Sequence, residues 1–476
     1  MRGIKELFDK LQSWRSKAKS RSQKIIALRQ RLKEIISSRE NWKRKYYELK
    51  LENEYLHNQL KRGTKVSYTK VVHHTYSAEQ ISLALRLRHE GKCSYRSCVL
   101  VMKIISDWLL LNWRIPVASS VHSWDIKLGY AKVETRSSED CCEYALIMDE
   151  SISIGSEKIL LLTGVDLSRY DFDRPLQMSD VKILSINMGK SWKAEAICPI
   201  IKRLEQAHNS FKYACCDNGH NLRKALIDSG IPHVKDCGHL LGGLMQKKYK
   251  GHATFKNFSE QLRKFKLSIQ AGKYAAYIPP KWRTKGRFMN LWAVCEWAKK
   301  MLNLVRYYQD NMFFKEVLTK LVWLEEYEDF IEKLYAEQQL INKINKELKH
   351  FGLTAQTLQK CKTLIANSGI DVKLKEQMEE YLSGTWNQVK AFEKVIISSD
   401  IIESIFGRFK HRVANHPQGG ITPGCLTIAN YDKELDSRII KDVFEKVKMI
   451  DVENWRKENL SISIFQKKKR LFKNTG

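Results

Sequence analysis

The clearest strand signal in the chain is 142-CEYALIMDESISIGSEKILLLTGVDL-167, where two apolar runs are joined by polar residues around Gly155. This pattern predicts a β-hairpin. The next segments read as a strand, a helix, a strand, a helix and a short strand, at 181-VKILSINMG-189, 192-WKAEAICPIIKRLEQAHN-209, 211-FKYACCD-217, 221-NLRKALIDSG-230 and 232-PHVKDCGH-239. The order predicts an α/β domain, a mixed sheet covered by helices.

Acidic residues stand at the ends of two of these strands. Asp149 ends the first apolar run, Asp217 ends the fourth strand, and Glu403 lies on a much later helix. Neighbouring strand ends and a helix beside them can bring such distant residues to one point. Two alternatives stay open, because Asp166 could replace Asp149 and Asp400 could replace Glu403. Each acid could also be a turn residue or an exposed helix residue.

Three carboxylates at one point repel one another and stay ionised only beside divalent cations. Oxygen ligands of this kind suit Mg²⁺ or Mn²⁺. Two such ions can hold a phosphoryl group for in-line displacement. The pattern therefore predicts two ions per active site, with Asp149, Asp217 and Glu403 as both catalytic residues and metal ligands.

A zinc site is the competing interpretation of the same region. Cys215 and Cys216 are adjacent, so on a strand they point to opposite faces. A set of one of these cysteines with His220, Cys237 and His239 lacks the Cys-x2-Cys spacing of structural zinc sites. The sequence favours magnesium over zinc.

The charge of the chain indicates a polyanionic partner. Its 476 residues include 83 Lys and Arg against 53 Asp and Glu, a formal net charge of +30. Such a surplus favours nucleic acid. No apolar run reaches the roughly 20 residues of a membrane span, and the charged N-terminus has no signal-peptide core. Eleven irregularly spaced cysteines are typical of reduced thiols. We expect a cytoplasmic protein of a prokaryote, or a nuclear one of a eukaryote, that binds no membrane.

Residues 25–60 carry a heptad pattern, within a segment over residues 1–65 that we predict to be a coiled-coil dimerisation helix. One seam position holds Ile25, Leu32, Arg39, Tyr46, Asn53 and Leu60, and the other holds Leu28, Ile35, Trp42, Leu49 and Leu56. Five heptads without Pro or Gly predict a coiled coil, and Asn53 on the seam favours a two-stranded one. We expect a homodimer, with a single amphipathic helix packed on its own protein as the alternative.

Residues 66–135 read as three short helices with tight turns. Ser77, with Gln80 three residues later, predicts a capping box at the start of the first. The third helix is polar, and Ser120, His122 and Lys127 on it are candidate DNA contacts in a helix-turn-helix. A helical bundle without a DNA role is the alternative.

Residues 246–394 read as successive helices, residues 395–430 as one more helix and a loop, and residues 431–476 as a basic tail. After Glu403 follow the candidate phosphate contacts Arg408, Lys410, His411 and Arg412. Trp386 could stack on an extruded base, although a packed core tryptophan is the preferred interpretation.

The order of elements, with "LIMDES", "ACCDNG" and "SSDIIESIFGRFK", resembles the RNase H-like catalytic domain of DDE transposases of insertion sequences. Asp149, Asp217 and Glu403 match the family's three acids, and the resemblance covers roughly residues 65–430. It implies a catalytic core over residues 136–245 and 395–430, interrupted by an all-α insertion over residues 246–394, as in hAT-like elements.

Two further motifs match subgroups of this family. The run from Asp236 to His239 fits an Asp-or-Cys, two residues, His pattern, which implies an ordering or DNA-proximal role for His239. Glu403 and Lys410 fit a Glu-x6-Lys signature. The arginine and tyrosine that precede the glutamate there are here Ser399 and Ile396, a departure that speaks against a hairpin-forming cleavage route.

The resemblance implies a transposase that binds terminal inverted repeats, cuts the DNA ends by metal-dependent hydrolysis and joins the 3′ hydroxyl ends to target DNA. A structure-selective nuclease on the same fold is the enzyme alternative. A domesticated relative that only binds DNA is the non-enzyme alternative.

Overall fold

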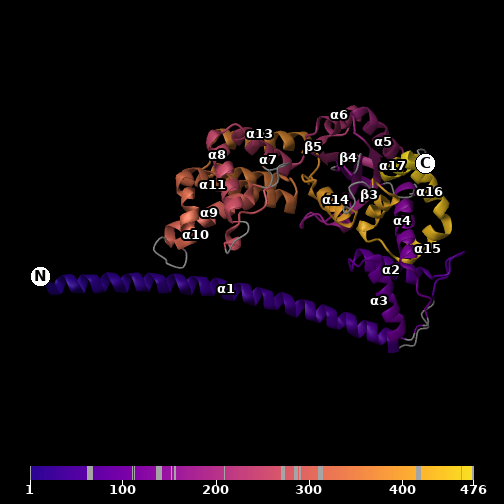
Figure 1. Ribbon diagram of the computed structural model, residues 1–476, viewed down its shortest axis with the longest axis horizontal. Coiled ribbons are helices and arrows are strands. Elements are labelled where there is room, and N and C mark those ends of the chain that lie inside the picture. The colour runs from indigo at the N-terminus through magenta and orange to yellow at the C-terminus, as the bar shows by residue number, and fades with distance from the viewer. Residues whose placement is uncertain are drawn as a thin grey trace. The chain divides into compact units, whose positions relative to one another are not determined.

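The computed structural model contains a five-stranded mixed sheet flanked by helices (Figure 1). Its strands are β1 (Cys142–Glu150), β2 (Lys158–Asp166), β3 (Val181–Gly189), β4 (Asn209–Cys216) and β5 (His233–Lys235). The order is β3-β2-β1-β4-β5. The pairs β1–β2 and β2–β3 are antiparallel, and β1–β4 and β4–β5 are parallel. The predicted α/β architecture, a mixed sheet flanked by helices, is confirmed.

The structure describes residues 2–61, 68–109, 111, 113–135, 142–151, 153–154, 157–207, 209–269, 274–282, 288, 291–308, 315–413, 420–462 and 464–473. Within these, side chains are described for fewer residues, and that of Arg412 is not among them. The expected turn at Gly155 lies outside the described residues.

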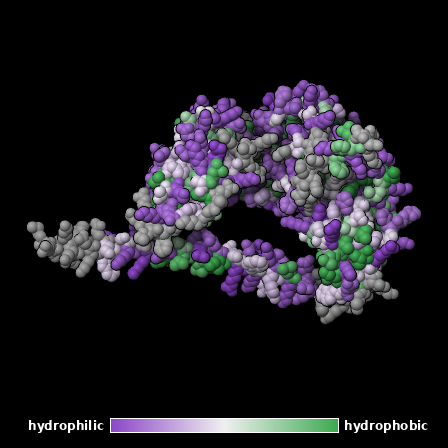
Figure 2. Space-filling view, viewed as in Figure 1, coloured by the Kyte–Doolittle hydropathy of each residue, from purple (hydrophilic) through white to green (hydrophobic). Residues whose placement is uncertain are grey.

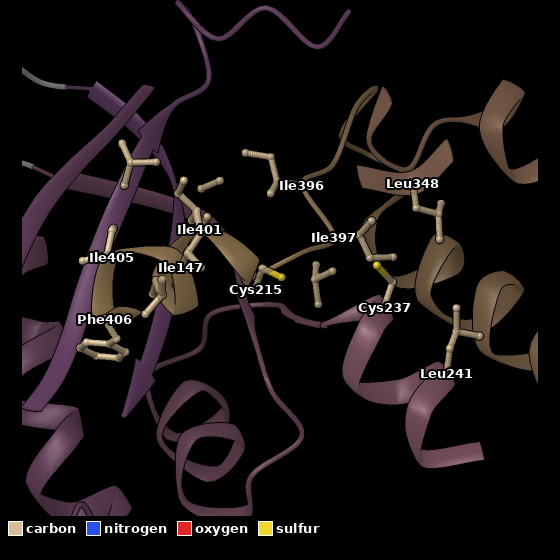
Figure 3. Packing of buried hydrophobic residues seen from close by; sticks show 14 of the residues in the cluster. Ile147, Cys215, Cys237, Leu241, Leu348, Ile396, Ile397, Ile401, Ile405 and Phe406 are labelled. Atoms are coloured by element: carbon tan, nitrogen blue, oxygen red, sulfur yellow. The ribbon is translucent and has the colours of Figure 1, made fainter. Parts of the chain in front are cut away.

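Helices cover both faces of the sheet because the strands are apolar on both sides. On one face, α5 (Ala194–Gln206) and α6 (His220–Asp228) pack against side chains that include Tyr144, Leu146 and Cys216. On the other face, Ala145, Ile147 and Cys215 belong to the largest core of the protein, together with residues of α14 (Asp400–Val413). Figure 3 shows Ile401, Ile405 and Phe406 of α14 beside Ile147 of β1.

A run of helices separates β5 from α14, as predicted. It comprises α7 (Cys237–Tyr249), α8 (Ala253–Ile269), η2 (Ala275–Tyr277), α9 (Trp292–Tyr307), α10 (Lys315–Leu321), η3 (Val322–Tyr327), α11 (Glu328–Phe351), α12 (Ala355–Ala366) and α13 (Val372–Val389). Helices α8, α9 and α10 form a core of their own, around Phe258, Leu302 and Leu321. Helices α7, α11, α12 and α13 join the core of the sheet, where Leu241 of α7 lies near Leu348 of α11 (Figure 3).

The C-terminal residues are folded, which corrects the expectation of a basic tail over 431–476. They form η4 (Pro423–Asp432), α15 (Ser437–Lys446), α16 (Met449–Asn459) and α17 (Ile464–Lys473). Ile440 and Phe444 of α15 are buried in one core with residues of α2 and α4. The apolar face of α15 explains this burial, because its exposure to water would cost free energy.

Three helices precede the sheet, namely α2 (Ala78–His89), α3 (Tyr95–Trp108) and α4 (Ala118–Glu134). The predicted capping box of Ser77 and Gln80 opens α2. Helix α4 is buried through its middle, from Trp124 to Gly129. At Gly129 a side chain would collide with the backbone carbonyl of Leu426 in η4, so glycine permits this close packing.

Residues 1–68 form a compact unit separate from the rest of the chain. The described residues of this unit include one long helix, α1 (Arg2–Lys61). Apolar side chains of the heptad are exposed along it, for example Leu28 at 65%, Trp42 at 70% and Leu49 at 64%. Figure 2 shows hydrophobic residues on the surface of this helix between hydrophilic ones. Among the described helices, none combines the length and apolar character that a membrane crossing requires.

Candidate functional site

The first two acids lie at the same edge of the sheet. Strands β1 and β4 run parallel, and Ile147 pairs with Cys215 two residues before each acid. Side chains alternate along a strand, so Asp149 and Asp217 fall on the same face as this pair. That face is the one that α14 covers. Sequence and register therefore bring Asp149 and Asp217 together beside the helix that carries Glu403.

The alternative first acid, Asp166, lies at the opposite end of the sheet. It pairs with Tyr144, whereas Asp149 pairs with Leu161. Five residues of strand separate the two positions, about 17 Å. The Asp166 carboxylate accepts hydrogen bonds from the backbone and hydroxyl of Ser168, at 3.0 and 2.6 Å. Asp166 thus holds the turn after β2 and takes no part in the candidate site.

Asp217 sits in a tight turn between β4 and α6. Its Oδ1 accepts a hydrogen bond of 2.9 Å from the backbone N–H of Gly219. A Cβ at Gly219 would lie 2.8 Å from this oxygen. Glycine is therefore needed for the carboxylate to be held in this way. Asp149 is held likewise, with its Oδ1 accepting from the N–H of Glu150 at 2.7 Å.

The third acid belongs to the first turn of α14. The alternative there, Asp400, forms an ion pair with Lys349 of α11. Glu403 instead lies next to His239 of α7, with 3.5 Å between His239 Nε2 and Glu403 Oε1. The Glu403 side chain is 56% exposed, although its place between two apolar residues led us to expect an inward position. It faces solvent at the site, because Ile402 and Ile405 turn to the core on the other side of α14.

Electrostatic coupling links the three acids and His239. Burial raises the pKa of Asp149 to about 7, and the Asp217 and Glu403 carboxylates add to this rise. The hydrogen bond to Glu403 raises the pKa of His239 to about 9, with Asp236 and Asp217 contributing. At neutral pH the site thus holds a protonated His239 among carboxylates, one of which ionises at a cost.

Asp236 forms hydrogen bonds that connect the elements of the candidate site. It is 1% exposed and caps α7, accepting the N–H of His239 at 2.7 Å. Its other oxygen accepts the N–H of Ser399 at 2.6 Å and the hydroxyl of Ser399 at 3.0 Å, just before α14. Its own N–H donates to the carbonyl of Cys216 at the end of β4. One side chain and its backbone therefore connect the elements that carry Asp217, His239 and Glu403.

Of the four basic residues predicted to contact phosphate on α14, Lys410 lies near the acids and His411 is exposed to solvent. Burial lowers the pKa of Lys410, and the nearby Asp149 carboxylate opposes this shift, so Lys410 lies within reach of the acids. His411 is exposed on the next position of the helix. The Arg412 side chain lies outside the described part of the protein.

Arg408 has a different environment from the one expected. Its Nη2 donates to the backbone carbonyl of His89 at 2.6 Å, and its guanidinium lies 4.3 Å from the centre of the Tyr431 ring. These contacts join α14 to the end of α2 and to η4. The prediction that Arg408 contacts phosphate is corrected, because the structure uses this side chain between its own elements.

The three residues of α4 that were predicted to contact DNA differ in their exposure to solvent. Lys127 is 4% exposed, and its amino group donates to the carbonyl of Phe444 at 3.0 Å. Burial lowers the pKa of Lys127 to about 8. Lys127 therefore cannot contact DNA from this position, and that prediction is wrong. Ser120 is half-buried, and His122 is exposed with its ring 5.0 Å from the Tyr95 ring.

A buried ionic group explains why the middle of α4 does not present its polar residues to solvent. Asp125 is fully buried and accepts hydrogen bonds from Tyr95 and Asn430, each at 2.7 Å, and lies 2.7 Å from His89. These partners come from α3, η4 and α2. Polar residues in the middle of α4 thus connect helices within the protein.

Trp386, Cys215 and Cys216 pack in the hydrophobic cores of the protein. Trp386 is half-buried and packs against the main core, as the preferred interpretation held. Cys215 and Cys216 are fully buried on opposite faces of the sheet. Among the residues that the structure describes, no group of three or more His, Cys, Asp and Glu side chains is arranged to hold a metal ion.

The acids nevertheless have the chemistry of a magnesium site. Carboxylate oxygens from Asp149, Asp217 and Glu403 are hard ligands. The pKa of Asp149 is raised mainly by burial and further by the Asp217 and Glu403 carboxylates, and a bound cation would favour its ionised form. Glu403 is turned toward His239, so a shared ion would require this side chain to reorient.

Replacing Asp149 by Asn is expected to stabilise the metal-free protein at pH 8 by on the order of 2 kcal/mol, and to change little near pH 4. The folded pKa of about 7 lies above the unfolded value, so the folded state binds the extra proton. The free energy of unfolding of the wild type therefore falls as pH rises from about 4 to about 7. Urea titrations at both pH values measure the difference.

The matched control is Glu150→Gln, whose carboxylate forms a surface ion pair with Lys158. Mg²⁺ should raise the stability of the wild type more than that of the Asp149→Asn variant. Equal stabilities of variant and wild type at pH 8 would contradict a strained Asp149 carboxylate.

Comparison with known proteins finds structural likeness without sequence relatives. No family model matches the chain, and no curated protein matches it. A solved structure described as a Drosophila P element transposase strand transfer complex is similar, with 12% sequence identity and a TM-score of 0.43. The similarity covers 81% of this chain and 100% of that one. A likeness at this level does not carry a function over, so the interpretation of the site rests on its own residues.

Proposed function

We propose that this chain is a DNA transposase whose RNase H-like core cuts and joins DNA strands. The observation that supports the proposal is the position of Asp149 and Asp217 at neighbouring strand ends, beside the helix α14 that carries Glu403. Burial raises the pKa of Asp149 to about 7, and the Asp217 and Glu403 carboxylates add to this rise. Three carboxylates that disfavour one another's charge, close to the lysine Lys410, form a site for phosphate chemistry with cations.

In this proposal the three acids hold two Mg²⁺ or Mn²⁺ ions, which would activate the attacking oxygen and stabilise the leaving one. The pair with His239 holds Glu403 beside the site, from which Glu403 would turn to a bound ion, and Asp236 holds His239 and α14 in register. Lys410, with His411 and Arg412 near it on α14, binds the phosphates beside the reacting bond.

The reaction proceeds in two displacements at phosphorus. In the first, water forms a bond to the phosphorus at the element end while the bond to the 3′ oxygen breaks. This leaves a 3′ hydroxyl and a 5′ phosphate, and a proton passes to solvent. In the second, the 3′ hydroxyl attacks a target phosphodiester, releases the target's own 3′ oxygen and loses its proton. No covalent bond between protein and DNA is needed.

The other parts of the chain have proposed roles in assembly. Helix α1, within residues 1–65, joins two copies of the chain through its heptad seam. Residues 66–135 bind the inverted repeats, with Ser120 and His122 as the remaining contacts of α4. Residues 136–245 and 395–430 form the catalytic core, and residues 246–394 its all-α insertion.

The proposal is tested by incubating the protein with DNA that ends in the element's inverted repeats, together with Mg²⁺ and a target plasmid. We expect both nicked ends and joined products. Nicked ends without joined products would indicate the structure-selective nuclease instead. Binding without either product would indicate a relative that only binds DNA.

A further inference from the structure

Basic residues occupy six of the eight positions that flank the heptad seam of α1 between residues 24 and 50, and the other two positions hold Ile36 and Ser38. With Ile25 and Leu28 on the seam, the two flanking positions hold Lys24, Arg29, Arg31, Lys43, Lys45 and Lys50 between residues 24 and 50. The acidic residues of this segment, Glu34, Glu40 and Glu48, lie on the outer positions of the heptad. The flanks of the seam therefore carry charge of one sign.

This arrangement opposes pairing of two copies of α1 in either direction. In a parallel pair, Lys24 faces Arg29 of the second copy and Lys45 faces Lys50. In an antiparallel pair, each basic flank faces the same flank of the second copy. Like charges at these positions disfavour pairing, and Arg39 on the seam adds to the repulsion.

The apolar side chains of the seam are exposed on a single α1 helix, so their burial against a partner would be favourable. Ile25, Leu32, Ile35 and Tyr46 are 49 to 62% exposed on α1, in addition to Leu28, Trp42 and Leu49. Covering such a stripe with a second helix removes apolar surface from water. Nucleic acid alone cannot cover it, since DNA presents phosphates along its outside. The hydrophobic effect thus favours pairing, while the flanking charges oppose it.

We propose that DNA binds along the basic flanks of a paired α1 and so couples dimer formation to DNA binding; this rests on the proposed function. Residues 24–50 span about 40 Å of helix. They carry nine Lys or Arg and three Glu in each copy, so a pair presents a dense positive rod. Duplex DNA carries one phosphate per ~1.7 Å of axis, and its charge is complementary. Phosphates neutralise the flanks, and the seam then closes between two copies of this chain.

Salt separates this mechanism from ordinary dimerisation. Without DNA, salt screens the repulsion between the flanks, so self-association of the full chain should become tighter as NaCl rises from 50 to 500 mM. With DNA, the complex should weaken over the same range because phosphate contacts are lost. If α1 instead paired with a separate helix that has acidic flanks, rising salt would only weaken the complex, and self-association of the chain would not tighten.

The test is sedimentation equilibrium of the full chain in EDTA, which prevents cleavage, with and without a 30-base-pair duplex of arbitrary sequence. We expect the duplex to lower the dissociation constant of the dimer at least about tenfold at 100 mM NaCl. Lys24→Gln with Lys45→Gln should tighten the DNA-free dimer by a similar factor. The matched control, Lys33→Gln with Arg44→Gln, removes the same charge from outer positions and should leave that dimer unchanged.

Two outcomes would overturn the inference. One is a DNA-free dimer that is tight and independent of salt. The other is a chain that stays monomeric on the duplex. This includes a chain that binds DNA as a monomer and one that pairs only with an added peptide of acidic heptads. Leu28→Asp with Leu49→Asp should abolish dimer formation on DNA, which excludes two monomers bound side by side. Because no reaction is measured, failure here leaves the proposed cleavage activity intact.

Discussion

Asp217→Ala is expected to lower DNA cleavage by at least about 1000-fold while DNA binding is retained. The carboxylate is the middle acid of the site, and no neighbouring side chain can take its place at the end of β4. Its loss removes a ligand and a charge without disturbing the core, since the side chain is only half-buried. Single-turnover cleavage of labelled DNA ends in Mg²⁺ measures the effect.

Asp228→Ala is the control for this variant. Asp228 is an exposed aspartate at the end of α6, the helix that follows Asp217. It should keep wild-type cleavage. Asp149→Ala and Glu403→Ala should resemble Asp217→Ala, since the three acids act as a unit. Full activity in Asp217→Ala would mean that the cleavage chemistry lies elsewhere.

Asp236→Ala is expected to lower the free energy of unfolding by about 3 kcal/mol. The carboxylate is buried, accepts three hydrogen bonds and caps α7. Its removal leaves the N–H groups of His239 and Ser399 without this acceptor in a place that water reaches poorly. Urea unfolding followed by circular dichroism measures the loss.

Asp436→Ala is the matched comparison, because Asp436 caps α15 and accepts from Arg438 at 2.7 Å but is exposed. It should cost only about 1 kcal/mol. Asp236→Asn should restore part of the stability, since the amide oxygen can still accept. An equal loss in Asp236→Ala and Asp436→Ala would show that Asp236 acts as a simple cap and not as a link between α7 and α14.

The sheet could be predicted from sequence because its signal is local. Each strand is a short apolar run, and the order of strands and helices along the chain limits the topologies to a few. The placement of Asp149 and Asp217 on one face follows from strand alternation once Ile147 pairs with Cys215. The choice of Asp149 over Asp166 needed the register of β1 against β2, which the sequence does not contain.

The basic residues were harder to interpret, because a positive charge is compatible with both surface and interior. Lys127 and Arg408 were expected at DNA and instead contact backbone carbonyls inside the protein. Their partners, Phe444 and His89, are 317 and 319 residues away in the chain. No local pattern reveals contacts of this range. The C-terminal helices were missed although α15 has a local amphipathic pattern, with Ile440, Val443 and Phe444 at helical spacing.

Asp236 makes contacts that its short sequence motif does not predict. The sequence placed it in a short pattern with His239, but its hydrogen bonds to Ser399 depend on a segment 163 residues later. Ser399 occupies the place where a related signature has arginine, and here its N–H and hydroxyl both bind Asp236. The position is thus explained by an internal contact. The catalytic roles of Asp149, Asp217 and Glu403 stay a prediction until activity is measured.

The most direct test of these roles is the metal dependence of Asp217→Cys. A thiolate is a softer ligand than a carboxylate and binds Mn²⁺ more readily than Mg²⁺. If Asp217 contacts the metal during cleavage, this variant should be inactive in Mg²⁺ and regain cleavage in Mn²⁺, while Asp217→Ala stays inactive in both. Equal cleavage by Asp217→Cys in the two metals, or recovery of Asp217→Ala in Mn²⁺, would contradict the account.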